Sequence, residues 1–473
     1  MAKRTTNVPS ATHTARVRTT SKRLLSAVAI GAVSAVTASV AAGGAAFAAP
    51  DYPSWNDVER AKQNESTKQA EIATLGELLD GLATEAARTV TTAQIAAEAY
   101  RVTQDALDAA TTRETSLNDQ AETAEATAAT SKMRAGLIAA HLAKSGASGL
   151  SLNLFLNGNS ADDLLSQLGT ASKLSEQSEQ IYTEAVQDKN AAESLGEQAA
   201  SATEERERLT EESRTTFEAA AASSMAAEAA YDTQQRKSSE LFEQLALLKD
   251  TTAEAERSFH AGEDAAAAAV AFAQAQASAG AVAAAAAAQA ARDAAAATAG
   301  SGSGSGPGSA SGSGAVTPVT PSAPVTPSAP ATPSTPATPS TPVAAPNASV
   351  VDTALAFARN QLGDRYVFGG SGPDAWDCSG LTKAAYAAAG VYIGSHSATN
   401  QYNTMARQGK LVSFDQVQVG DLVFWGSPGN YYHVAIYAGN GQILEAPNPS
   451  ARVRVHSIWS SWAVAPYVGR PAA

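Results

Sequence analysis

Three residues near the carboxyl end of the chain combine the side chains of a thiol hydrolase: a cysteine, a histidine and a carboxylate. Cys378 is the single cysteine among 473 residues, and it opens a helix-like stretch. A thiol at a helix start meets free backbone N–H groups and the positive end of the helix dipole, which both favour the thiolate. A buried structural cysteine, or one reserved for an intermolecular disulfide, is the alternative. Its place between Asp377 and Ser379 suits neither role well, so the sequence favours a nucleophile.

A thiolate nucleophile needs a general base, and the base needs a group that orients it. His433 opens an apolar strand that ends at residues 439–441 (Gly-Asn-Gly), and Glu445 lies on the strand that follows. A two-residue turn would place Glu445 opposite Ile436, among apolar side chains. A three-residue loop places it opposite Ala435, on the same face as His433, and separates an apolar from a polar face. We therefore predict the three-residue loop and a His433–Glu445 pair.

Two further histidines of the same region compete for the role of base. His396 begins a helix-like stretch, and His456 shares the charged outer face of an alternating strand with two arginines. We expect both to be polar surface or site-rim residues. The three histidines and the cysteine have structurally different settings, which is unlike a metal-ligand set. The sequence therefore predicts neither a metal nor a cofactor.

The amino terminus has the composition of a secretory signal. Residues 1–23 contain six basic and no acidic residues, an apolar run covers 24–42, and an Ala-Phe-Ala triplet ends at Ala48. Small residues at these positions predict cleavage after Ala48. The run is long enough for an uncleaved anchor, but its Ser, Thr and Gly content makes it a poor membrane span. We expect residues 1–48 to be removed and the mature chain to be secreted, extracellular or associated with the cell wall.

Residues 49–300 have the composition of long helices. No proline occurs from Ser54 to Gly306, and good helix formers dominate. Leucines repeat at helical spacing over 75–82, and alanine fills many other inward positions, which predicts a thin, all-α antiparallel coiled coil. Without residues 1–48 the chain has 27 basic and 46 acidic residues, and the acidic excess lies before the linker. This charge argues against nucleic acid as a partner.

The helical pattern breaks at the middle of this region, over residues 144–169. A Gly/Ser-rich stretch is followed by leucines at every second position from Leu150 to Leu156. We expect two long arms joined by a small apolar lobe at the tip. The leucines are either the packed end of the hairpin or a docking surface for a partner, because a hairpin tip has few neighbours to cover them.

Residues 301–348 have the composition of a linker. They contain no charged residue, and Gly/Ser repeats are followed by Thr-Pro and Ser-Ala-Pro repeats. We expect such a segment to be a disordered linker, flexible in its first part and semi-rigid in its second. It predicts a tether to a compact domain over residues 349–473.

Four motifs of residues 349–473 resemble, in type and in order, those of the NlpC-type cell-wall cysteine peptidases. They are Tyr366-Val367-Phe368-Gly369-Gly370, Asp377-Cys378-Ser379-Gly380, Val419-Gly420-Asp421-Leu422-Val423-Phe424-Trp425 and His433-Val434-Ala435-Ile436-Tyr437. His396-Ser397 with Gln401 resembles a further family stretch. The succession of signal, coiled coil, Pro-rich linker and C-terminal peptidase resembles actinobacterial division hydrolases of the Rip type.

The resemblance implies a multi-domain chain whose last domain has a papain-like α+β fold. It implies Cys378 as the nucleophile and His433 as the base, with Glu445 at a third position that is often His, Asn or Gln in the family. It also implies a substrate, the peptidoglycan stem peptide, which is cut between D-γ-glutamate and the diamino acid through a thioester.

The same resemblance suggests residues around the reacting carbonyl. The Cys378 backbone N–H and Tyr366 are expected at the oxyanion. Asp377, Ser379 and Ser397 are expected to contact the substrate, although Asp377 is equally explained as a helix cap.

Two other functions are compatible with the sequence. One is a division scaffold that binds wall peptide or is held inactive, and the other is an amidase or acyltransferase on the same fold. In related coiled-coil hydrolases the arms contact an ABC-type complex of the division membrane, so such a complex is an expected partner of the tip. We also expect Arg452 and Arg454 to meet acidic helix faces, which would shield Cys378. On that basis residues 349–473 alone should hydrolyse wall faster than the full chain.

Overall fold

A computed structural model describes residues 52–146, 161–300 and 343–473 of the chain. The predicted signal peptide, the leucines of the predicted tip and most of the predicted linker lie outside these residues.

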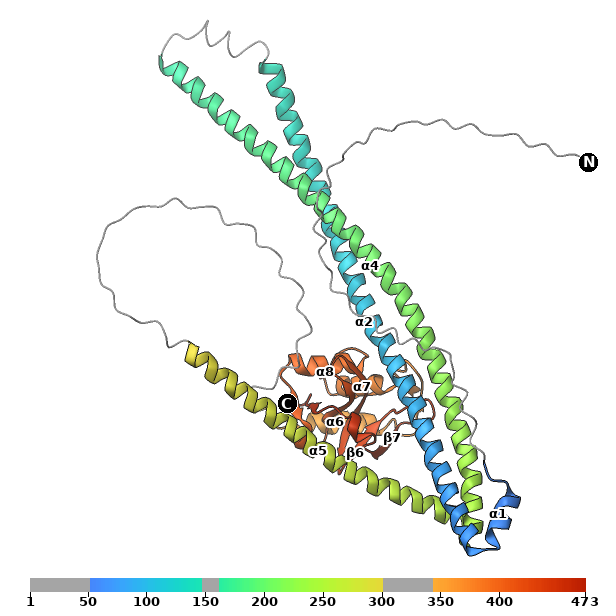
Figure 1. Ribbon diagram of the computed structural model, residues 1–473. Coiled ribbons are helices and arrows are strands. Elements are labelled where there is room, and N and C mark those ends of the chain that lie inside the picture. The colour runs from blue at the N-terminus through green and yellow to red at the C-terminus, as the bar shows by residue number, and fades with distance from the viewer. Residues whose placement is uncertain (1–51, 147–160, 301–342) are drawn as a thin grey trace, which may run out of the picture. The chain divides into compact units, whose positions relative to one another are not determined.

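The first part of the chain is helical, as predicted. Its helices are α1 (Trp55–Lys62), α2 (Glu65–Gly146), α4 (Ala161–Lys249) and α5 (Ala253–Gly300). Helices α2 and α4 run side by side (Figure 1). They are antiparallel, because residue numbers rise along α2 while the numbers of their partners on α4 fall. These pairs are Gln104–Ser213, Glu114–Arg206 and Ser131–Asp188.

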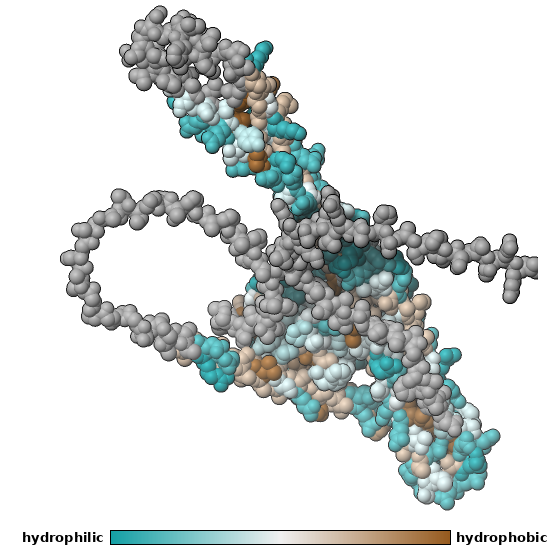
Figure 2. Space-filling model, turned by 45° about the horizontal axis from the view of Figure 1, so that its top comes forward, coloured by the Kyte–Doolittle hydropathy of each residue, from teal (hydrophilic) through white to brown (hydrophobic). Residues whose placement is uncertain are grey.

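The core of this hairpin is concentrated near α1. A buried apolar cluster there consists of Val58, Ala61, Leu75, Leu79, Leu241, Leu245 and Leu248. Farther along, a smaller cluster joins Leu117 to three alanines. Alanine buries little apolar area, so each contact there contributes little stabilisation. The described surface of the hairpin is mostly hydrophilic with separate apolar patches (Figure 2).

A six-stranded antiparallel sheet forms the centre of the C-terminal domain. Its strands are β3 (Leu411–Ser413), β4 (Leu422–Ser427), β5 (Asn430–Gly439), β6 (Gln442–Glu445), β7 (Arg454–Ser457) and β8 (Tyr467–Gly469), in the spatial order β3-β8-β4-β5-β6-β7. Helices α6 (Ala348–Arg359), α7 (Cys378–Ala388) and α8 (Ala398–Arg407) belong to the same domain. They share one buried core with the inward side chains of the sheet, including Val434, Ile436 and Leu444. Two short parallel strands, β1 (Arg365–Tyr366) and β2 (Ala375–Trp376), precede α7.

The second face of the sheet is also apolar, and α5 packs on it. Phe272 of α5 lies against Phe414 and Tyr437, with ring centroids 5.6 and 6.3 Å apart. Ala279 is buried in the same cluster as Val423, Trp425 and Ile443. The expected polar second face is therefore wrong: α5 buries that face. By length and composition, α5 is also the one helix of the described residues that is apolar enough to cross a membrane.

The β5–β6 hairpin reaches the predicted register by a different turn. Asn440 and Gly441 both have positive φ and form a two-residue turn closed by Gly439 opposite Gln442. A register shift between Tyr437 and Gly439 then brings Ile436 opposite Leu444. Continued by one residue, this register places Ala435 opposite Glu445, as the three-residue loop would have done. The bulge supplies the extra residue that the predicted loop was meant to provide.

Candidate active site

Cys378 lies at the first position of α7, where the sequence predicts it. The Asp377 side chain caps this helix by accepting the Gly380 N–H at 2.8 Å. Burial, together with the charges of Asp377 and Glu98, raises the pKa of the Cys378 thiol, against the lowering effect of N–H donors from Val434 and Ser379. The helix start was expected to favour the thiolate, but burial and the two negative charges outweigh that effect. The Cys378 side chain is therefore held as a neutral thiol.

His433 and Glu445 form the predicted pair. His433 Nε2 lies 3.0 Å from Glu445 Oε2, and both side chains are fully buried. Burial raises the pKa of Glu445, but the hydrogen bond and charge of His433, the charge of Arg454 and the hydrogen bond from Trp459 lower it to about 2. Because an ionised carboxylate only accepts hydrogen bonds, Nε2 carries the imidazole proton. The other ring nitrogen, Nδ1, is left as the basic atom.

Two residues that the sequence analysis did not assign to the site hold Glu445. Arg454 donates to Glu445 Oε1 at 3.1 Å, and Trp459 donates from its indole nitrogen to Oε2 at 3.0 Å. Trp425 stacks on Trp459 with centroids 5.0 Å apart, and both rings flank His433. Arg454 was predicted to meet acidic helix faces, and that prediction is wrong, because its partner is Glu445.

Two further predicted site residues, Tyr366 and Ser379, lie on β1 and in the first turn of α7. Tyr366 ends β1 and pairs with Trp376, two residues before Cys378, and burial together with the charges of Asp377 and Cys378 raises the pKa of its phenol. Ser379 is buried, and its carbonyl accepts from Gln401 at 2.8 Å. Gln401 also accepts from Thr382, so it ties α8 to α7.

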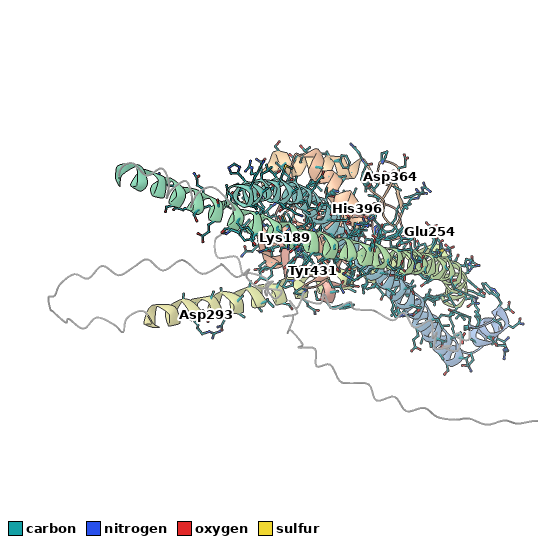
Figure 3. All side chains as sticks on the ribbon, turned by 90° about the horizontal axis from the view of Figure 1, so that it is seen from above. Lys189, Glu254, Asp293, Asp364, His396 and Tyr431 are labelled. Carbon is teal, nitrogen blue, oxygen red and sulfur yellow. The ribbon has the colours of Figure 1, made fainter. Side chains whose placement is uncertain are left out.

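Asp377 has more partners than a simple helix cap. His396 Nε2 lies 2.5 Å from Asp377 Oδ1, and Arg101 of α2 lies 3.2 Å from Oδ2. Burial raises the pKa of Asp377, but its contacts with His396, Arg101 and Gly380 outweigh this and lower it. His396, labelled in Figure 3, is thus placed beside the predicted nucleophile, as a site-rim residue. His456 is exposed and only meets the Ser457 carbonyl.

Helix α2 places an amide against the basic nitrogen of His433. Gln94 is 3% exposed, its Nε2 lies 3.3 Å from His433 Nδ1, and the same nitrogen donates to the Pro447 carbonyl at 2.7 Å. Its side-chain oxygen is buried without a hydrogen-bond partner among the described residues. Within that part of the chain no hydrogen bond joins Cys378 to His433.

One helical turn along α2, the Glu98 carboxylate lies on the N-terminus of α8. It accepts the Ser397 hydroxyl at 2.6 Å and the N–H groups of Ala398 and Thr399 at 3.0 and 2.9 Å. Burial outweighs these donors and raises the pKa of Glu98 to about 7. Ser397, predicted to contact substrate, therefore contacts a carboxylate of the chain itself.

The contacts of α2 with this site come from one face of the helix. Gln94, Glu98, Arg101 and Asp105 are spaced i, i+4, i+7 and i+11, and Asp105 accepts from Ser395 at 2.5 Å. The sequence analysis missed all four because they lie 276 or more residues from their partners. The one local signal is a change of composition: Ile95 and Tyr100 interrupt an alanine-rich pattern. Residues of this kind are unusual on the solvent face of such a helix.

Among the residues that the structure describes, no group of three or more His, Cys, Asp or Glu side chains is arranged to hold a metal ion. What the described groups can do is acid–base and nucleophilic chemistry. A thiol at a helix start and a histidine oriented by a buried carboxylate, on an α+β domain, are groups that thiol hydrolases use.

Residues 363–469 match the NlpC/P60 family, so this segment of the chain is an NlpC/P60 domain. Over 101 residues it is 39% identical to the peptidoglycan endopeptidase RipA of Mycobacterium tuberculosis, which covers 21% of this chain and 20% of RipA. It is 38% identical over 115 residues to a Corynebacterium glutamicum protein named "Probable endopeptidase", covering 24% of this chain and 51% of that protein. The solved P60 domain of a Mycobacterium avium subspecies paratuberculosis antigen is 31% identical, with a TM-score of 0.24, over 26% of this chain and 96% of that one. The chain thus spans about half or less of the length of these two curated relatives.

Proposed function

We propose that this protein is a secreted, cysteine-type peptidoglycan endopeptidase. It cuts the stem peptide between D-γ-glutamate and the diamino acid, in cell-wall remodelling or daughter-cell separation. The observation that carries the proposal is the buried His433–Glu445 pair, whose Nδ1 faces the α2 amide, together with Cys378 at the start of α7. The names of the relatives, endopeptidases of peptidoglycan among them, support the same reaction class.

The proposed reaction follows from these positions. His433 Nδ1 takes the proton of the Cys378 thiol, and the sulfur attacks the carbonyl carbon of the substrate amide. The Cys378 backbone N–H and Tyr366 stabilise the oxyanion. His433 then gives its proton to the leaving amine, and water hydrolyses the thioester to release the second product. Glu445 stays ionised and stabilises the imidazolium that forms between the two steps.

The contacts of α2 support a second part of this proposal: the protein is held inactive by its own helical arm. Gln94 presents a side-chain amide to the general base, Glu98 presents a carboxylate to α8, and Arg101 presents a cation to Asp377. A substrate amide needs the place beside His433 Nδ1 that Gln94 fills. The shielding of Cys378 expected from the sequence is retained in this proposal, with α2 in place of the expected contacts of Arg452 and Arg454.

Wall digestion with the full-length protein tests both parts. Purified peptidoglycan is incubated with the wild type and with the double variant Glu98→Ala/Arg101→Ala, and new termini are identified by mass spectrometry. We expect stem-peptide fragments, released faster by the double variant because two contacts of α2 are lost. The matched control is Arg113→Ala/Glu122→Ala, which changes exposed charges of the same helix.

Each remaining outcome contradicts a defined part of the proposal. Free sugar chains in place of stem-peptide fragments would indicate an amidase, and no release by any variant would favour the scaffold. Equal rates for the wild type and the double variant would remove inhibition by α2 while leaving the endopeptidase intact.

A further inference from the structure

A groove lies on the side of the NlpC/P60 domain that carries Tyr366. It has a volume of about 520 Å³ and is lined by residues 365–368 and 449–452 of the NlpC/P60 domain and by four residues of α4 between 221 and 228. Tyr366 connects this groove to the predicted reacting centre, because it lines the groove and pairs with Trp376, two residues before Cys378. The wall formed by residues 365–368 and 449–452 belongs to the domain itself, so it stays available to a ligand that extends beyond the scissile bond when the arm, with α4, leaves the site.

Two arginines face each other in the wall of this groove. Arg365 and Arg452 are direct partners in an antiparallel bridge between the β1 segment and the chain before β7. Directly opposed residues carry their side chains on the same face, roughly 5 Å apart at Cβ, and like charges in that position are destabilising. Both arginines are exposed. The backbone thus concentrates positive charge at one point of the groove.

No carboxylate neutralises this pair within the described part of the chain. Arg452 donates to the Gly363 carbonyl at 2.7 Å, and neither guanidinium has an ion-pair partner there. The nearby Asp364 accepts from the Trp376 indole at 3.1 Å. Glu228 lines the α4 side of the groove without reaching either arginine. The unneutralised charge is a property of the groove that the proposed chemistry does not use.

We propose that Arg365 and Arg452 form an anion subsite that binds a carboxylate of the stem peptide outside the reacting bond. This inference rests on the proposed endopeptidase function. Guanidinium groups match the planar, two-oxygen geometry of a carboxylate, and a bound anion removes the repulsion between the two cations. The subsite would select stem peptides whose carboxyl groups are free over those in which they are amidated.

Kinetics with paired substrates test this selection. The full-length protein and its Arg365→Ala and Arg452→Ala variants are compared on one soluble stem peptide, prepared with free carboxyl groups and with the terminal carboxyl groups amidated. We expect each substitution to raise KM for the free acid about five- to tenfold with kcat nearly unchanged. For the amidated peptide the variants and the wild type should have similar KM values. Arg359→Ala, an exposed arginine at the end of α6, is the matched control.

A binding measurement separates failure of this subsite from failure of the proposed reaction. Calorimetry with the Cys378→Ala protein reports the Kd of the same free-acid peptide without turnover, and adding Arg365→Ala should weaken it by the same factor. Inorganic phosphate should compete with the peptide for the two arginines, because the same guanidinium groups bind other oxyanions. Unchanged Kd and KM in both arginine variants would overturn the subsite, as would equal losses on the free and amidated peptides. Binding without cleavage of the peptide by the wild type would count against the reaction and leave the subsite standing.

Discussion

Glu445 is the residue at which the polar contacts of the site converge. His433, Arg454 and Trp459 all donate to its buried carboxylate. Glu445→Gln keeps an acceptor but removes the charge that stabilises the imidazolium, so the hydrolysis rate should fall yet persist. Glu445→Ala should cost more, because it also leaves buried donors unpaired, at about 1–3 kcal/mol each. Rates from steady-state assays decide this, and unchanged rates in both variants would place the third catalytic group elsewhere.

Cys378 is predicted to be dispensable for folding and essential for turnover. Its side chain is small and lies at a helix start whose cap is Asp377, so Cys378→Ala removes little buried volume. We expect hydrolysis to disappear while the thermal midpoint moves by only a few degrees. Residual hydrolysis at a substantial fraction of the wild-type rate would exclude the covalent mechanism. Near-UV circular dichroism provides the control for folding.

The residues of the site differ in how far the sequence predicts them. Cys378 and Glu445 could be placed because a helix start and a hairpin register are local, and both carry strong turn and periodicity signals. Arg454 was assigned to an outer face because alternation alone does not show that a neighbouring Trp459 closes over Glu445. Glu98 could not be found at all, because a long helix of nearly uniform composition does not show which of its faces a distant domain covers.

At the scale of the element, the α2 contact should respond to pH. The pKa of Glu98 is raised to about 7 in the docked state, chiefly by burial, against an ordinary value near 4.5. Docking is therefore fully favoured below about pH 4.5 and weakens as pH rises through 7, by roughly 3 kcal/mol in total. The charge of Glu98 acts on the Cys378 thiol, which is a titratable neighbour. The Arg101–Asp377 ion pair lies one turn of α2 farther along the same contact.

Glu98→Gln separates this effect from the ionisation of the nucleophile itself. The amide is neutral at every pH, so the variant should stay docked where the wild type opens. We expect the wild type to be at least about fivefold more active than Glu98→Gln at pH 8 and nearly equal to it at about pH 4.5. The ratio of the two rates across pH is the measurement. A ratio that does not change with pH would show that Glu98 does not titrate with docking.

Helix α5 is predicted to stabilise the NlpC/P60 domain although it lies outside the matched segment. Phe272 packs on Phe414 and Tyr437, and its replacement by alanine should lower the free energy of unfolding by about 2 kcal/mol, since the ring is only half-buried. Phe259→Ala, at an exposed position of the same helix, is the control. Denaturant unfolding of the full-length protein, followed by tryptophan fluorescence, reports the difference. Equal midpoints for the two variants would mean that the sheet does not need α5.

At the scale of the whole molecule, this packing changes how the chain can be divided. Alternation along β5 predicted one apolar and one polar face, but Ala435 and Tyr437 are buried on the second face together with Ile443. Sequence periodicity could not reveal this, because small and aromatic residues on that face were compatible with partial exposure. A fragment that begins at Ser349 would expose this apolar face to water. Comparison of full-length variants is therefore a cleaner test of inhibition by α2 than the isolated domain.

The even spacing of Gln94, Glu98, Arg101 and Asp105 along one stiff helix has a mechanical consequence. A slide of α2 along its axis by one residue would displace all four side chains by about 1.5 Å, and a slide by a full turn would displace them by about 5.4 Å. None of the four contacts can then be lost alone, so the four contacts between α2 and the domain form and break together. A small axial pull applied far along the arm would free the site abruptly, and the length of the arm would set how remote the source of that pull can be.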